Sequence, residues 1–348
     1  MNDVIDLLAK EMELSPRTIY RALRNQGSEA RPSVARRAEE IRRRAANLGY
    51  RTNVAARSIR EGNFKQMVFV TARFDHGYAP TLSNYVMVLS ELLLQRGCHL
   101  LLEEFLIDRR TGKARQPRKL FSERAADGIF AVVSAGHFPP EMETALSELD
   151  LPLVWLNHLP SAPDSSAVIS DESAAVTEMC RHLAALGHRR IAFLTLDYEH
   201  YSAGHRKAEM ERAAKETGLD LAVIRTNESS GQSSIRKTVN CFLDDHFPHR
   251  TAAVCYNREF MEVLRFEAAK RGIPIPGRLS VCHFISIFER QVLMEFPLSG
   301  VMLPEERMAR EALKRMDLIA AGHPCGGPPI PVPATFVTGE STAPAPAK

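Results

Sequence analysis

Residues 3–24, DVIDLLAKEMELSPRTIYRALR, decide the fold of the first part of this chain. Four apolar residues in the first half fall on one face of a helix: Ile5, Leu8, Ala9 and Met12. Ser15 is a typical N-cap residue, and Pro16 suits the first helical position because its missing N–H costs nothing there. The stretch therefore predicts two short helices joined by a tight turn.

The second helix has an apolar back and a polar front. Its buried stripe consists of Ile19, Ala22 and Leu23. The N-cap and the outward side chains are the candidate DNA contacts: Ser15, Arg17, Thr18, Tyr20, Arg21 and Arg24. A short helix that presents arginines and hydroxyls suits the major groove of DNA. The alternative is an ordinary solvated helical hairpin, because such patterns also arise by chance.

A third helix is predicted over residues 33–48, after a linker at 25–31. Its apolar stripe is Val34, Ala38, Ile41, Ala45 and Leu48, and Gly49 fits the position just past a helix end. Residues 1–62 hold 12 arginines and one lysine against eight acidic residues, a net charge of +5, whereas the whole chain carries +3. A basic end on a near-neutral body is typical of a DNA-binding domain attached to a sensing domain; a solvated basic helix is the alternative.

Residues 53–62, NVAARSIREG, favour a helix by composition but are too short to form one alone. Isolated helices shorter than about 12–15 residues are marginal in water. A segment that becomes helical only when a partner stabilises it is suited to couple one part of the protein to another.

From Met67 onward, short apolar runs alternate with helical patterns. Strands are expected at residues 67–70, 99–104, 128–134, 151–157, 189–196, 222–226, 252–257 and 279–284. Helices are expected at residues 82–96, 204–217 and 260–272, and from the cap Asp171 to Gly187. This alternation predicts an α/β fold with two doubly wound parallel-sheet subdomains, whose continuous apolar runs suit strands covered on both faces.

Composition excludes several classes of protein. Hydrophobic content of 45% and charged content of 25% are those of a globular chain, and no apolar run is long enough to span a membrane or serve as a signal peptide. The six cysteines (98, 180, 241, 255, 282 and 325) are scattered, which favours reduced thiols over disulfides or a zinc site. The sequence contains no GxSxG, P-loop, HExxH or GxGxxG motif, so we expect no enzyme, metal or cofactor.

Several segments together resemble the LacI/GalR (lactose repressor/galactose repressor) family of bacterial transcription factors. They are LSPRTIYRALRNQ, LGYRTNVAARSIREG, ALGHRRIAFLT, RGIPIPGRLSV and GESTAP, in the family's order and spacing. The resemblance implies a helix-turn-helix DNA-binding domain at 1–50, a hinge helix at 51–64 and a periplasmic-binding-protein-like core at 65–340. The core would consist of an N-subdomain (65–159 plus 293–322) and a C-subdomain (160–292 plus 323–340), followed by a loose tail at 341–348.

The resemblance also implies how DNA is bound. A homodimer, with a tetramer as the alternative, would bind a palindromic double-stranded operator in the bacterial cytoplasm, at the nucleoid. Residues 53–59 match the hinge helix, which folds on operator DNA; its expected contacts are Asn53, Ala56, Arg57 and Ile59. Ile59 stands where the family usually has a leucine that wedges into the minor groove, and such wedges kink DNA. The sequence departs from the family at Glu13, usually a glycine of the turn, and at Thr52, usually a proline.

In the family, a small-molecule effector binds between the two core subdomains. Arg206 and Asn257 match its effector-contacting arginine and asparagine; the alternatives are a surface arginine and a strand-end cap. Tyr78 and Ser134 are weaker candidates from the rule that ligands bind at the carboxyl ends of parallel strands. Sugar-binding relatives have an aspartate pair where this chain has Ile285 and Ser286.

This departure suggests a carbohydrate-derived or anionic effector, bound by Arg206 with help from Arg73 or Arg258; the alternative for Arg258 is a solvent-facing role. Asp171 is expected to cap a helix. The rival to a DNA-binding regulator is a solute-binding protein of periplasmic type, which would leave residues 1–62 without a role.

Overall fold

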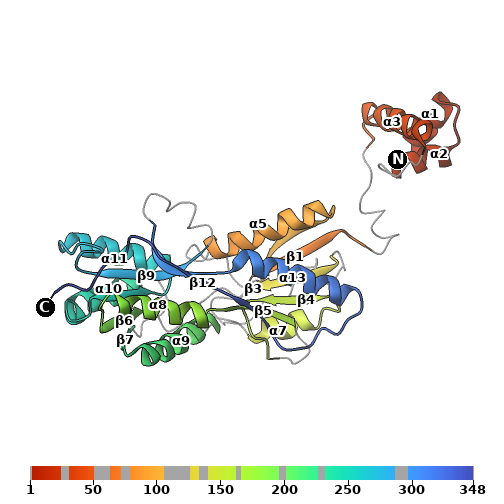
Figure 1. The fold of residues 1–348 in the computed structure, drawn as a ribbon. Helices are drawn as coiled ribbons and strands as arrows, with labels where there is room; N and C mark the ends of the chain where they lie inside the picture. Colours follow the sequence, from red (N-terminus) through yellow and green to blue (C-terminus); the bar gives the residue numbers. More distant parts are fainter. Residues whose placement is uncertain are drawn as a thin grey trace. The chain divides into compact units, whose positions relative to one another are not determined.

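The computed structural model describes residues 2–24, 31–50, 63–71, 79–105, 126–132, 140–161, 166–195, 201–225, 232–286 and 297–347. The chain divides into two compact units, Met1–Phe64 and Lys65–Lys348, called here the head and the core. Figure 1 shows both. None of the described helices has the length and apolar character needed to cross a membrane.

The head consists of three helices: α1 (Asn2–Glu11), α2 (Pro16–Arg24) and α3 (Pro32–Asn47). The Ser15 hydroxyl accepts a hydrogen bond from the Thr18 backbone N–H at 3.1 Å, so Ser15 caps α2 as expected. The shared core is made by Leu8, Ala9, Ile19, Leu23, Ala38, Ile41 and Ala45. The expected stripe of α3 is wrong at its two ends, because Val34 and Leu48 are exposed.

The turn between α1 and α2 places Glu13 at φ 51°, in the left-handed region. A residue with a Cβ in that region destabilises the folded state by roughly 1–2 kcal/mol. Glycine avoids this cost, but it loses more conformational entropy on folding. This explains how the turn forms without the glycine that the family resemblance implies.

We expect Glu13→Gly to stabilise the head by about 0.5–1 kcal/mol, because the relief of strain exceeds the entropy of glycine. Amide hydrogen exchange at the buried residues Leu8 and Ile19 of the full chain measures this as slower exchange. Glu13→Ala, which keeps a Cβ, should give no such gain. Faster exchange in Glu13→Gly would contradict the strain argument.

The first subdomain of the core contains a six-stranded sheet in the order β11-β5-β4-β3-β1-β2, in which every described pair is parallel. Its strands are β1 (Gln66–Thr71), β2 (His99–Glu104), β3 (Gly128–Val132), β4 (Leu153–Leu156), β5 (Ser166–Asp171) and β11 (Ile330–Pro333). Its helices are α5 (Ala79–Gln95), α7 (Pro140–Ser147) and α13 (Glu305–Ala320).

Alternate residues of the strands β1 to β5 enter two separate apolar clusters. Phe69 packs with α5 and α13 on one face, whereas Val68 and Val70 pack with α7 on the other. Both faces are therefore buried, as the continuous apolar runs predict.

The second subdomain contains a sheet in the order β12-β10-β9-β8-β6-β7, parallel except for β12. Its strands are β6 (Arg190–Leu194), β7 (Asp220–Ile224), β8 (Ala252–Cys255), β9 (Ser280–Ile285), β10 (Ser299–Met302) and β12 (Thr335–Val337). The helices are α8 (Ser173–Ala185), α9 (Tyr201–Thr217), α10 (Gln232–Cys241), continued by the π-helical turn η1 (Phe242–His246), and α11 (Arg258–Lys270). The prediction of an α/β fold with two doubly wound subdomains is confirmed.

The chain crosses between the subdomains three times, from β5 to α8, from β10 to α13 and from β11 to β12. This corrects the expected boundaries near residues 160, 293 and 323. β5 belongs to the first sheet, β10 to the second and β11 to the first again. The polar stretch around residue 160 resembles a linker, but it is the loop that connects β4 to β5 within one sheet.

The expectation of a loose tail at 341–348 is also wrong over its described part, which extends to residue 347. Ser341 is fully buried, donates a hydrogen bond to the carbonyl of Val281 and accepts one from the N–H of Ser299. The Ala345 N–H bonds to the Leu186 carbonyl. The tail is therefore part of the second subdomain.

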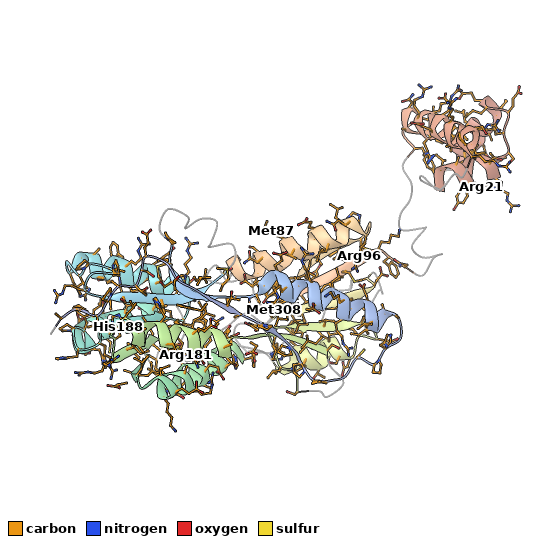
Figure 2. All side chains as sticks on the ribbon, in the orientation of Figure 1. Arg21, Met87, Arg96, Arg181, His188 and Met308 are labelled. Atoms are coloured by element: carbon orange, nitrogen blue, oxygen red, sulfur yellow. The ribbon has the colours of Figure 1, made fainter. Side chains whose placement is uncertain are left out.

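His188, which is labelled in Figure 2, joins this tail to the sheet through hydrogen bonds. Its ring nitrogens lie 2.7 Å from the Thr251 hydroxyl and 3.0 Å from the Ser280 hydroxyl, and the second nitrogen also lies 3.2 Å from the Ala343 carbonyl. Burial lowers the pKa of His188, and a hydrogen bond to Ala343 only partly opposes this. Burial likewise lowers the pKa of His158 and of His182. His158 is thus a neutral donor to Glu143 despite their 2.6 Å contact.

Because these folded-state pKa values lie below the unfolded value of about 6.5, the unfolded chain binds more protons. Their contribution to stability is complete above about pH 6.5 and is lost as the pH falls toward the folded values. We therefore expect the Tm of the core to be flat from pH 7 to 8 and to fall below pH 6.5. His188→Gln should reduce that slope, and a Tm that rises on acidification to pH 5.5 would contradict the burial argument.

Candidate DNA interface and effector site

The front of α2 carries the predicted DNA contacts. Ser15, Arg17, Thr18 and Arg21 are exposed, and Tyr20 is half-buried. Figure 2 shows Arg21 on this helix. The hydroxyls of Ser15 and Thr18 lie 2.8 Å apart, so both are held at the N-terminus of α2. The side chain of Arg24 and the hinge residues Asn53, Ala56, Arg57 and Ile59 lie outside the described residues.

The arginines of the head fall into two groups. Arg43 and Arg44 both pair with Glu40, and Arg44 also pairs with Glu11. Within the described part of the chain, Arg17 and Arg21 form no ion pair, so their charges are available to a phosphate or a base.

Arg206 of α9 is 5% exposed and lies at the carboxyl end of the second sheet. Its Nε and Nη2 donate to the two carboxylate oxygens of Glu172 at 2.9 and 3.0 Å. Its Nη1 donates to the Tyr256 carbonyl at 3.2 Å, and its guanidinium lies 4.4 Å from the centre of the Phe284 ring. The arginine predicted to contact the effector is therefore buried in a bidentate ion pair with Glu172 and is not a surface arginine.

A second buried polar cluster joins the two subdomains. Asn84 of α5 donates from Nδ2 to the Ser286 hydroxyl at 2.6 Å and to Glu305 Oε2 at 2.5 Å. Ser286, which follows β9, donates to the same Glu305 oxygen at 3.0 Å. Glu305 begins α13 just after the second crossing and is 1% exposed. A side chain of each subdomain therefore donates to one carboxylate oxygen.

Tyr85 is influenced by the charges of both clusters. Burial raises its pKa well above 10, the Glu305 and Glu172 carboxylates add to the rise, and Arg206 opposes it. Tyr85 donates to the Met308 sulfur at 3.4 Å. The phenol therefore stays neutral, in the electrostatic field of both clusters.

A third contact between the subdomains joins β4 to α9. Asn157, which follows β4, donates from Nδ2 to the Ser202 hydroxyl at 2.6 Å. Its φ of 54° is one that asparagine tolerates better than most residues. The backbone conformation thus aims a polar side chain from one subdomain at the other.

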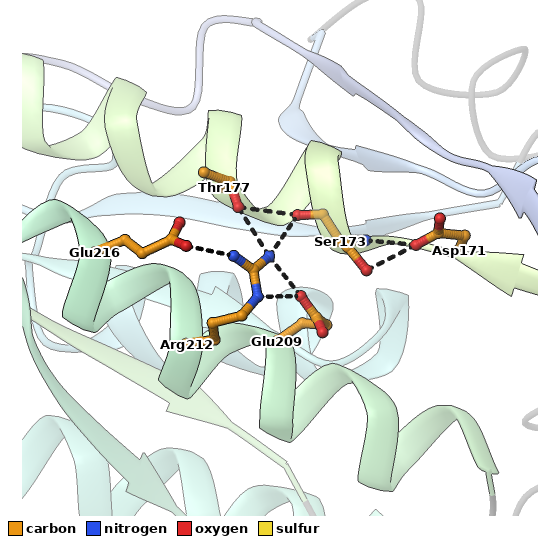
Figure 3. A network of polar contacts seen from close by, with 6 residues as sticks. All are labelled: Asp171, Ser173, Thr177, Glu209, Arg212 and Glu216. Carbon is orange, nitrogen blue, oxygen red and sulfur yellow. Dashed lines mark hydrogen bonds and ion pairs between the residues drawn. The ribbon is translucent and has the colours of Figure 1, made fainter.

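The first crossing is fixed by the network in Figure 3. Asp171 accepts from the N–H and the hydroxyl of Ser173 at 3.1 and 2.7 Å, which lowers its pKa and confirms it as a helix cap. Arg212 of α9 binds Glu209, Glu216, the Ser173 carbonyl and the Thr177 hydroxyl. These bonds join the start of α8 to α9, and so hold Glu172 beside Arg206.

Of the other predicted effector residues, Asn257 caps α11, since its Oδ1 accepts from the Phe260 N–H at 3.2 Å. Arg258 pairs with Glu262 at 2.6 Å, with 31% of its side chain exposed. Arg73, Tyr78 and Ser134 lie outside the described residues. The structure thus brings Arg206 next to Tyr256, the neighbour of Asn257, but engages Arg258 elsewhere.

Sequence reasoning missed the residues that now define the site: Asn84, Asn157, Glu172, Ser202 and Glu305. Glu172 follows Asp171, which the sequence analysis interprets as a helix cap. Its acidic side chain was the only sign in the sequence that it could pair with an arginine. Asn84 and Glu305 are far apart in sequence and meet only because α13 returns to the first subdomain.

Residues 180–342 match the model of a periplasmic binding protein-like domain. The sucrose operon repressor of Escherichia coli is 23% identical over 312 residues, which cover 88% of this chain and 90% of that protein. The transcriptional regulator DegA of Bacillus subtilis is 24% identical over 364 residues, covering 99% of each chain.

The fold is similar to that of the lac repressor dimer bound to operator and the anti-inducer ONPF. The TM-score is 0.76 at 17% identity, and the match covers 97% of this chain and 98% of that one. Both units of the chain thus have counterparts in these relatives. The chain is therefore similar in sequence to transcriptional regulators over most of its length, and it shares the fold of the lac repressor.

Proposed function

We propose that this protein is a transcriptional repressor that binds a specific operator and whose affinity for it changes when a small molecule binds between the core subdomains. The observation that supports this most directly is the front of α2. Two exposed arginines that form no ion pair within the described residues lie beside a capped helix N-terminus, and this surface suits a DNA groove.

The proposed DNA partner is a palindromic duplex bound by a homodimer. Two heads would read half-sites about one helical turn apart, Arg21 and Arg17 contacting guanine edges or phosphates. The hinge at 51–64 would pair and fold on the central step, with Ile59 as the wedge. Such a regulator would work at the bacterial chromosome, in the cytoplasm.

The proposed effector acts by a population shift. The two subdomains of the core are joined by three crossings and by polar contacts, and in this proposal they can separate or close together. A ligand that favours one arrangement changes the population competent for DNA, by a coupling free energy of about 1–3 kcal/mol. No catalytic role is proposed for this site.

Selection from a random duplex library with the full-length chain, followed by fluorescence anisotropy, tests the proposal. We expect enrichment of an inverted repeat and affinity at least about 1,000-fold above that for unrelated DNA. The logarithm of the binding constant should fall linearly with the logarithm of salt concentration. A solute-binding protein would enrich no sequence, and a metabolic enzyme would turn over its ligand.

A further inference from the structure

We propose that Ser286, Asn84 and Glu305 form a releasable latch between the two core subdomains. When the latch breaks, the subdomains turn about the first and third crossings, which stay joined to each other. This device would regulate the operator binding proposed above, and it therefore rests on that proposed function.

Two of the three crossings carry a buried glutamate. Glu172 is the single residue between β5 and α8, and Glu305 begins α13 just after the second crossing. Each is 1% exposed. Each also accepts hydrogen bonds from side chains of both subdomains, which buried carboxylates require. The donors held by these two carboxylates therefore tie the subdomains together at two separate points.

The contacts around Glu172 resist separation. Arg206 of the second subdomain binds Glu172 with two charged donors, at 2.9 and 3.0 Å. Pulling the two apart would leave opposite charges buried and unpaired, which is strongly unfavourable in a protein interior. The backbone adds a further bond, because the Ala334 N–H between β11 and β12 donates to the Asp171 carbonyl at 2.7 Å. The first and third crossings are thus held together as a pivot.

The contact between the subdomains at Glu305 can break without separating an ion pair. Ser286 of the second subdomain contributes a neutral hydroxyl, which lies 2.6 Å from Asn84 Nδ2 and 3.0 Å from Glu305 Oε2. Asn84 and Glu305 belong to the first subdomain and are bonded to each other at 2.5 Å. Their mutual bond can persist when Ser286 leaves, and the freed hydroxyl can bond to water. Release therefore breaks the two bonds of one neutral hydroxyl.

A latch of this strength suits regulation. Losing one hydrogen bond of this kind changes an equilibrium constant by about 3- to 10-fold. The latched and released arrangements are then close enough in free energy for a bound molecule to shift their populations. The stronger contacts at Glu172 keep the motion directed about one side of the core.

The variant Ser286→Ala in the full-length chain removes the latch hydroxyl. Its matched control is Ser280→Ala, because Ser280 begins the same strand, β9, and is 1% exposed. The hydroxyl of Ser280 bonds to His188 and Ala343, both within the second subdomain. Two measurements are made without any added ligand: hydrogen–deuterium exchange followed by mass spectrometry, and fluorescence anisotropy with the selected operator.

In Ser286→Ala we expect amide exchange at the start of α5 and at residues 303–308 to become about 3- to 10-fold faster. Exchange at residues 166–175, around Glu172, should stay unchanged. Operator affinity should change by about 2- to 10-fold, because the latch and the operator act on one equilibrium. Ser280→Ala should lower the Tm by a similar amount and leave both the exchange at these segments and the affinity unchanged.

Unchanged exchange at α5 and α13 in Ser286→Ala would overturn the latch. Equal acceleration at residues 166–175 would overturn the pivot, and faster exchange with unaltered operator affinity would overturn the regulatory role. Asn84→Ala provides a second variant, whose effect on exchange should not add to that of Ser286→Ala if the groups act as one unit; additive effects would contradict the latch. Wild type that binds no operator would count against the proposed function, whereas the exchange data would still decide whether the latch exists.

Discussion

Replacing Arg206 by alanine is expected to lower the free energy of unfolding of the core by about 3–5 kcal/mol. The change leaves the Glu172 carboxylate, 1% exposed, without the two donors at 2.9 and 3.0 Å that now compensate its burial. It also removes the cation from beside the Phe284 ring. For a unit of this size the loss corresponds to a fall in Tm of roughly 6–20 °C.

Differential scanning calorimetry of the full chain measures this loss. The matched control is Arg181→Ala, on the exposed face of α8, which should change stability by less than about 0.5 kcal/mol. Replacing both partners, as in Arg206→Met with Glu172→Leu, should restore much of the stability because no buried charge is left unpaired. A loss below about 1 kcal/mol in Arg206→Ala would show that the pair is solvated in solution.

Replacing Arg21 by alanine is expected to weaken operator binding by about 1–3 kcal/mol, or 5- to 150-fold. Arg21 is exposed on the front of α2 and has no ion pair within the described residues, so its whole charge is available to DNA. Contact with a base would relax selectivity at one position of the operator. Contact with a phosphate would weaken all sequences equally and reduce the salt slope by about 1.

Anisotropy titrations at several salt concentrations, with the selected operator and a scrambled duplex, separate these two outcomes. Arg181→Ala removes the same charge from the core and should leave the affinity for operator unchanged. Equal losses in Arg21→Ala and Arg181→Ala would mean that only net charge matters, and would contradict a specific role for α2. Arg17→Ala extends the test to the first turn of the helix.

The sequence predicted the parts of this fold that depend on local chemistry. The cap at Ser15, the cap at Asp171 and the alternation of strands and helices follow from neighbouring residues, and the structure confirms them. Short or polar elements escaped prediction. The strands β5, β10, β11 and β12 and the helix α13 were not predicted. β11 and β12 have only four and three residues, and β11 pairs with β5, which lies far earlier in the chain.

The candidate site was predictable only in part, for the same reason. Arg206 could be identified because it lies in a segment that resembles the family. Its partner Glu172 could not, because the two residues meet through the packing of α8 on α9. The departure at Ile285 and Ser286 was expected to remove a carboxylate, yet α13 delivers that of Glu305 to within 3.0 Å of the Ser286 hydroxyl.

The three crossings have a consequence for biosynthesis. The first sheet is completed by β11 and the second by β12, and both strands come from the last twenty residues or so of the chain. Domains usually fold in order as they leave the ribosome. Here neither subdomain can close its sheet until translation is nearly finished, whereas the head has long since emerged. A premature stop before β11 would thus release a complete head attached to two sheets that each lack one edge strand.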